Sequence, residues 1–208
     1  MEYLAYLIKQ RLPSLFVVIG CVGRWVVTRR FGRRMASAER CSLVEGFVND
    51  RPAHMRALHP SDIGELKVFF EELPQDWLKY FNPHSFKVDG LTFVLKQRAF
   101  LKYGLFVDGL LQGYALLKVA PTGSAFIGLL VHPDVSGLGL GRFIVGYLYW
   151  QASLAGLRTR STISKLNTAS LRSHRAVTNY KIIAELPNDY IMIEFPNESR
   201  LKPELKTP

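Results

Sequence analysis

Residues 131–143 read VHPDVSGLGLGRF and place three glycines, Gly137, Gly139 and Gly141, between an apolar run and a helix-like stretch. Glycine allows a backbone to approach a ligand closely and to adopt conformations that other residues avoid. A helix beginning there offers unpaired N–H groups and the positive end of its dipole, and both favour a phosphate. The stretch therefore predicts a phosphate-binding turn between a strand and a helix.

Two common phosphate-binding loops do not fit this turn. A P-loop needs Gly-Lys-Ser/Thr at the helix start, whereas the chain has Gly141–Arg142–Phe143. A dinucleotide fingerprint needs G-x-G-x-x-G and an acidic residue at the end of the next strand, and neither is present. Taken alone, the turn is also compatible with a tight connection that binds no ligand. The sequence around the turn must therefore distinguish between these two interpretations.

Strand-like and helix-like patterns alternate on both sides of the turn. In order, the sequence predicts a hairpin within 42–58, helices within 61–74, 75–86 and 89–95, three strands within 100–131, a helix to about 154, a strand, a short helix after 167, and a closing hairpin within 180–195. This order is typical of one α/β domain with a mixed sheet. We expect that domain to span 43–197, between an N-terminal arm (1–42) and a polar tail (198–208).

The segment GLLVHPDVSGLGLGRFIVGYLYWQA, residues 128–152, resembles the cofactor motif of the GCN5-related N-acetyltransferases (GNAT). In that family a strand, Val-x-Pro and an x-Gly-x-Gly-x-Gly turn lead into a helix, and the turn usually opens with Gln or Arg. Ser136 stands at that position here. A second family feature is an Asn near the end of the next strand, and Asn167 follows Gly139 by 28 residues. The element order agrees as well.

The resemblance implies an α/β GNAT fold: a mixed central sheet, flanking helices and a splayed strand pair that binds acetyl-CoA. The implied acetyl-CoA-binding residues are Leu129, Val131, Ser136, Gly137, Leu138, Gly139, Leu140, Gly141, Arg142, Asn167 and Ser170. Backbone groups of Leu129 and Val131 would bind the pantetheine arm, and the turn would bind the pyrophosphate. An equally good role for Asn167 is to cap the helix that follows it. No metal is expected.

Attack of an amine on a thioester needs a neutral amine, a polarised carbonyl and a proton for the departing thiolate. The family often supplies that proton from a Tyr seven residues after the Asn. His174 stands there, and its ordinary pKa near neutrality makes it the expected acid. Tyr180 is the reserve candidate, and the alternative for His174 is a plain helix-surface residue. Glu71, Glu72 and His84 are candidates for the acceptor site, although each is otherwise a solvated or capping residue.

The expected function is transfer of an acetyl group to a primary amine. The segment YFNPHSF (residues 80–86) offers aromatic, amide and imidazole groups, which suit an amino sugar of a surface polysaccharide. One alternative is a longer-chain acyltransferase that uses an acyl-carrier protein. Another is a non-catalytic binder of membrane or nucleic acid; nucleic acid is disfavoured because no recognised motif is present.

Residues 1–40 contain eight Lys/Arg and two Glu, so they hold +6 of the net charge of +10. The apolar run 12–23 is 12 residues long, shorter than the roughly 20 that a membrane span needs. No signal-peptide cleavage pattern follows it. The arm is therefore predicted to be either an interfacial anchor on anionic lipid or a set of helices packed on the domain or on a second subunit of a homodimer. Cys21 and Cys41 form no disulfide framework, which favours the cytoplasm, with peripheral contact to the inner face of a membrane.

Overall fold

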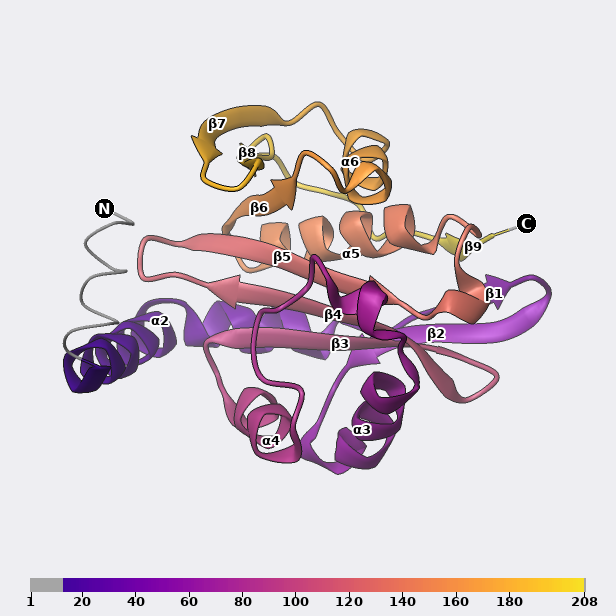
Figure 1. Cartoon of the computed structure of the whole chain (residues 1–208), viewed down its shortest axis with the longest axis horizontal. Helices are drawn as coiled ribbons and strands as arrows, with labels where there is room; N and C mark the ends of the chain where they lie inside the picture. Colours follow the sequence, from indigo (N-terminus) through magenta and orange to yellow (C-terminus); the bar gives the residue numbers. More distant parts are fainter. Residues whose placement is uncertain (1–12, 208) are drawn as a thin grey trace.

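The structure is a computed structural model that describes the backbone of residues 13–207 and the side chains from residue 18 onward. The described elements form one mixed sheet with helices on both faces (Figure 1), and the strand order is β7-β8-β6-β5-β4-β3-β2-β1-β9. In chain order the elements are α2 (Pro13–Arg40), β1 (Val44–Val48), β2 (Arg51–Ala57), η1 (Pro60–Asp62), α3 (Ile63–Glu72), η2 (Gln75–Leu78), α4 (Val88–Lys96), β3 (Phe100–Val107), β4 (Leu110–Val119), β5 (Ser124–Val131), η3 (Pro133–Val135), α5 (Leu140–Leu154), β6 (Arg158–Ser164), α6 (Thr168–Arg175), β7 (Lys181–Leu186), β8 (Tyr190–Glu194) and β9 (Leu205–Lys206).

Two hydrophobic cores lie on opposite faces of the sheet. Successive side chains of a strand point to opposite faces. In β3 and β4, Tyr103 and Leu117 therefore join the core beneath α2 and α5, whereas Phe106 and Tyr114 join the core beneath α3 and α4. A strand buried on both faces needs a nearly continuous apolar sequence, as FLKYGLFV in β3 has.

The second half of α2 is part of the domain. Val27, Phe31, Met35 and Ala38 recur at helical spacing, and all four are buried in the core that also contains α5. Arg30 adds a hydrogen bond from Nη1 to the carbonyl oxygen of Pro121, 2.8 Å away. This half of the arm therefore packs on the domain, one of the two arrangements that the sequence predicted. Among the described helices, none combines the length and the hydrophobicity that crossing a bilayer requires.

The C-terminal segment contributes to the sheet, which the sequence did not predict. Residues 205–206 form β9, which pairs in parallel with β1 opposite Gly46 and Phe47. Leu205 is buried. The segment therefore covers an edge of the sheet rather than forming only a polar tail.

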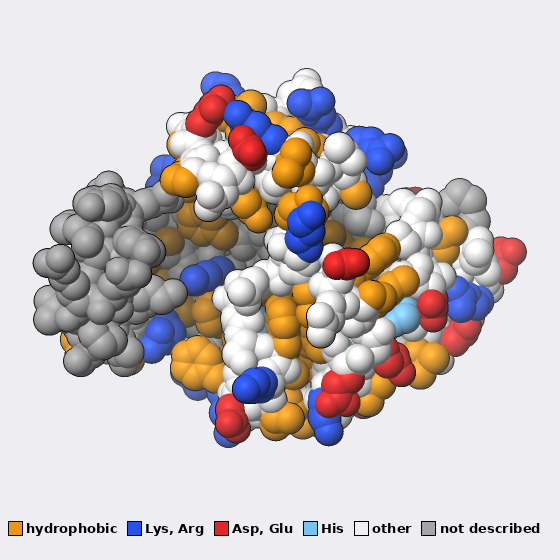
Figure 2. Space-filling model, in the orientation of Figure 1, with side chains coloured by type: hydrophobic (Ala, Val, Ile, Leu, Met, Phe, Trp, Pro, Cys, Tyr) orange, Lys and Arg blue, Asp and Glu red, His pale blue; other side chains and the backbone are white. Residues whose placement is uncertain are grey.

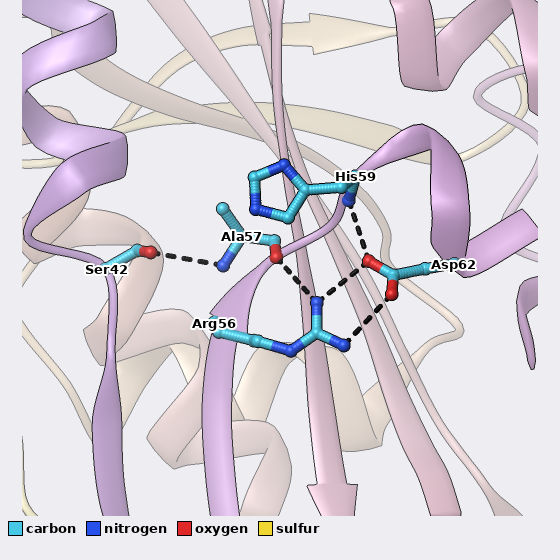
Figure 3. Close-up of polar contacts among 5 residues, drawn as sticks. All are labelled: Ser42, Arg56, Ala57, His59 and Asp62. Atoms are coloured by element: carbon cyan, nitrogen blue, oxygen red, sulfur yellow. Dashed lines mark hydrogen bonds and ion pairs between the residues drawn. The ribbon is translucent and has the colours of Figure 1, made fainter.

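A polar cluster joins the end of β2 to the start of the α3 layer (Figure 3). The Arg56 guanidinium donates to both carboxylate oxygens of Asp62, over 2.8 and 3.0 Å, and the backbone N–H of His59 donates to the same carboxylate over 2.7 Å. Burial by itself would raise the pKa of Asp62, but the Arg56 and His59 hydrogen bonds outweigh it, so the pKa lies below its ordinary value. The buried Asp62 carboxylate is thereby kept charged, and it holds the helical layer on the sheet.

Candidate active site

The candidate site begins where β5 and β6 part. The two strands pair in parallel only from Ser124 to Phe126 of β5. Beyond that point β6 continues its antiparallel pairing with β8. The second half of β5 therefore has an edge that no strand covers, and a wedge-shaped gap opens between β5 and β6.

The free edge of β5 is formed by the two residues that the sequence singled out. The N–H of His132 donates to the carbonyl oxygen of Gln112 on the β4 side, over 2.8 Å. Hydrogen-bonding direction alternates along an antiparallel strand. The backbone groups of Leu129 and Val131 therefore point away from β4 and into the gap.

The glycine turn lies at the mouth of this gap, between η3 and α5. Gly137 and Gly139 have φ values of +82° and +78°, and a Cβ added at either would have no protein atom within 4 Å. Gly139 is the N-cap of α5 and offers no capping side chain. Within the described part of the chain, no protein group accepts a hydrogen bond from the N–H groups of residues 138–142. These N–H groups are thus available to an anion at the positive end of the α5 dipole.

The gap, the turn and α6 line a cleft of about 780 Å³, a size typical of small-molecule sites. Its lining includes the predicted residues Leu129, Val131, Ser136, Gly137, Gly139, Leu140, Gly141, Arg142, Asn167, Ser170 and His174. Leu138 is half-buried against the core and is not part of that lining. Figure 2 shows that Lys and Arg side chains are frequent on the lobe above the cleft, which carries α6. Arg142 and Arg172 contribute positive charge to the cleft itself.

Asn167 and Ser170 meet in the first turn of α6. The Asn167 side-chain oxygen accepts from the Ser170 N–H over 3.0 Å, which is the capping role considered for it. This bond uses only the oxygen, so the Asn167 amide NH2 group can still donate to a ligand.

His174 is only 1% exposed, so it is not a helix-surface residue. Its Nδ1 lies 2.8 Å from the carbonyl oxygen of Ser170. A carbonyl only accepts, so Nδ1 carries the proton of the neutral ring and Nε2 is a bare acceptor. Burial lowers the pKa of His174 to about 4, although the Ser170 hydrogen bond acts in the opposite direction. The expectation of a pKa near neutrality was therefore wrong, because the sequence could not reveal the burial.

The remaining predicted residues lie outside the cleft lining. The Tyr180 hydroxyl accepts from Arg175 Nε over 3.2 Å, and its ring stacks on Phe195. Glu71 forms an exposed ion pair with Lys67, and Glu72 is exposed at the end of α3. His84 Nε2 lies 2.9 Å from the Tyr114 hydroxyl, and burial lowers the pKa of His84. His84 thus contacts the core beneath α3 and α4 through Tyr114.

Asp76 and Trp77 of η2 line the cleft on its other side, and the sequence analysis did not identify them. Tyr80 and Phe81, which also line it, belong to the segment 80–86 that was expected on the acceptor side. The Trp77 indole N–H donates to the carbonyl oxygen of Val131 over 2.7 Å. The only sequence signal for this segment is an aromatic-rich stretch after Pro74, which resembles many short amphipathic helices. Among residues 13–207, no three His, Cys, Asp or Glu side chains are grouped as a metal site would require.

No protein-family model matches the chain, and no curated protein matches it in sequence. Solved structures do match its fold. The GNAT domain of PAT from S. lividans superposes with a TM-score of 0.65 at 14% identity, covering 74% of this chain and 97% of that one. Ribosomal-protein-S5-alanine acetyltransferase from Vibrio fischeri gives 0.60 at 14% identity, over 74% and 97%. The yncA protein from Salmonella typhimurium, solved with its cofactor acetyl-CoA, gives 0.57 at 16% identity, over 74% and 99%.

The chain therefore has the GNAT fold, as the glycine turn and its surroundings predicted. The gap between β5 and β6 is the splayed strand pair that the sequence resemblance implied.

Proposed function

We propose that this protein is an acyltransferase that moves an acetyl group from acetyl-CoA to a primary amine. The observation that carries the proposal is the uncapped glycine turn at the start of α5, placed at the mouth of the β5–β6 gap. The turn offers a row of N–H donors with open space in front of them. A pyrophosphate bound there would be joined by Arg142, and the free edge of β5 would receive the pantetheine amides.

Acetyl-CoA supplies an activated acyl group, and the protein supplies alignment and proton control. Backbone groups of Leu129 and Val131 hold the extended arm along β5, while Asn167 and Ser170 face it from α6. His174 does not act as an imidazolium, since its pKa is about 4 and Nδ1 is committed to Ser170. It positions the first turn of α6 instead. We assign protonation of the departing thiolate to Tyr80, the one phenol among the described residues of the cleft.

The acceptor side of the cleft favours an amine that binds as an ammonium group. It loses one proton to water before attack and a second from the nitrogen once the amide bond forms and the C–S bond breaks, while Tyr80 protonates the departing thiolate. Asp76 is the only carboxylate among the described residues that line it, and it stands beside the rings of Trp77 and Tyr80. A carboxylate attracts an ammonium group, and aromatic faces stack on sugar rings and attract cations. We therefore propose an amino sugar as the first acceptor to test. The residues expected to bind it are Asp76 and Tyr80, instead of His84.

The full chain with acetyl-CoA should release free thiol when an acceptor is present. The panel should contain amino-sugar nucleotides, polyamines, aminoglycosides and peptides, with the highest turnover expected on an amino sugar. Tyr80→Phe should lower kcat by about 10²-fold, the low end for a general acid, and leave CoA affinity unchanged. Turnover confined to peptides would contradict the acceptor class, and turnover only with long acyl chains on a carrier protein would contradict the donor. An absence of turnover on every acceptor would count against the enzyme itself.

We also propose that the first half of α2 contacts an anionic membrane surface. Val18, Ile19, Val22 and Trp25 are each at least half exposed, and they share one helix face. Arg29 and Arg33 continue that face, and within the described part of α2 Glu39 is the only acidic residue. Apolar side chains followed by arginines suit insertion into the lipid interface with cations at the headgroups.

Glutamate at an exposed position of this face should weaken sedimentation with vesicles that contain phosphatidylserine. Val22→Glu and Trp25→Glu should each reduce the bound fraction severalfold, and neither should unfold the chain, because neither side chain belongs to a core. Leu110→Glu is the matched control, since Leu110 is 66% exposed on the β3–β4 hairpin. Equal sedimentation of all three variants would contradict membrane contact through α2.

A further inference from the structure

One hydrogen bond crosses the cleft where the cofactor arm would lie. Nε1 of Trp77, in η2, donates to the carbonyl oxygen of Val131 at the end of β5, over 2.7 Å. That carbonyl points into the gap, and it is one of the two backbone positions along which we place the pantetheine. The indole therefore already occupies an acceptor that a pantetheine amide N–H would use.

The segment that carries Trp77 is held loosely. No residue of η2 is buried, and Trp77 itself is 40% exposed. The backbone hydrogen bonds of the turn are local, from Trp77 N to Pro74 O and from Lys79 N to Asp76 O. A short segment with few buried contacts opens at little cost in free energy. The bond to Val131 is thus the specific link between this turn and the free edge of the sheet.

We propose that Trp77 is a gate residue that a pantetheine-bearing ligand displaces from Val131. This inference rests on the proposed function. The pantetheine amide N–H replaces the indole N–H on the same carbonyl, so the number of hydrogen bonds is conserved. A carbonyl oxygen has two lone pairs, so it is the bulk of the ring, which lines the same cleft, that makes the two partners exclusive. Once displaced, the ring leaves the cleft and becomes more exposed to water.

The exchange predicts that the gate weakens cofactor binding. The apparent affinity for CoA equals the intrinsic affinity multiplied by the fraction of molecules in which the Val131 carbonyl is accessible. A net hydrogen bond contributes about 1 kcal/mol, which corresponds to about fivefold in affinity. Trp77→Phe keeps an aromatic ring but removes the N–H donor, so its Kd for CoA should be about fivefold lower than that of the unaltered chain.

Tryptophan fluorescence reports the displacement directly. The chain contains three tryptophans: Trp25 is exposed on α2, Trp150 is buried in the core, and Trp77 lies in the cleft. Titration of the full chain with CoA should shift the emission to longer wavelength, because the Trp77 indole moves into water. Pantetheine should cause the same shift, which excludes quenching by adenine. The shift should be absent in Trp77→Phe and retained in the matched control Trp25→Phe.

Calorimetry with CoA separates this inference from the function on which it rests. If CoA binds the full chain but the emission does not change, or if Trp77→Phe binds CoA no more tightly, the gate is overturned and the cofactor site stands. If CoA does not bind the full chain at all, the proposed function and the gate are both overturned. Tighter binding by Trp77→Phe with loss of the emission shift supports the gate.

Discussion

Replacement of Gly139 by valine should weaken CoA binding by about 10³-fold while the fold remains intact. The backbone there has φ +78°, and a Cβ would point into open space in front of the turn, where the phosphates must approach. A branched side chain would hold the anion away from the N–H donors. Losing two charge-assisted hydrogen bonds of about 1.5–3 kcal/mol each corresponds to this drop in affinity. Isothermal titration calorimetry with CoA measures it.

Gly109→Val is the matched control for the strain. Gly109 has the same φ of +78°, and a Cβ there also meets no protein atom within 4 Å, but it lies on the β3–β4 hairpin. Both variants should lose similar stability, of about 1–2 kcal/mol, from placing a side chain on left-handed backbone. Only Gly139→Val should lose CoA. Equal affinities of the two variants for CoA would contradict a phosphate-binding site at this turn.

The protein should lose about 3 kcal/mol of stability as the pH falls from about 6.5 to about 4 because of His174 alone. The pKa is about 4 in the folded chain and about 6.5 in the unfolded chain. Between these two pKa values, His174 is protonated in the unfolded chain but stays neutral in the folded chain. The free energy of unfolding therefore decreases as the pH falls. His174→Phe should lack this component, because a phenyl ring does not titrate. Urea unfolding across the window measures the difference.

The effect of His174 is measured as the difference between the unaltered chain and His174→Phe. This is necessary because His54 and His84 also have lowered pKa values, so they too decrease the stability as the pH falls. His59→Phe, at an exposed site, controls for removal of a histidine. Parallel pH curves for the unaltered chain and His174→Phe would mean that the ring is not buried as described. In enzyme assays His174→Phe should leave the alkaline side of the pH–rate profile unchanged, because the ring is already neutral there.

The α/β fold and the backbone of the glycine turn were predictable because their signals are local. Three alternate glycines between an apolar strand and a helix impose a backbone that only glycine adopts easily, and Gly137 and Gly139 do have positive φ. The Asp108–Gly109 turn and the two-sided apolar strands follow equally from short-range patterns. Asn167 could be placed because a helix start needs a cap close in sequence.

What only the tertiary structure decided depends on contacts between distant segments. Burial turned His174 from an expected acid into a neutral, buried ring, and burial is set by neighbours such as Phe195 that no local pattern identifies. Trp77 reaches Val131 across 54 residues, so its place in the cleft could not be read from the sequence around it. The packing of α2 on the sheet and the pairing of residues 205–206 with β1 have the same origin. The backbone preference of a short segment depends on its own residues, so the sequence determined it. The chemistry of this cleft depends on contacts between remote segments, so only the tertiary structure determined it.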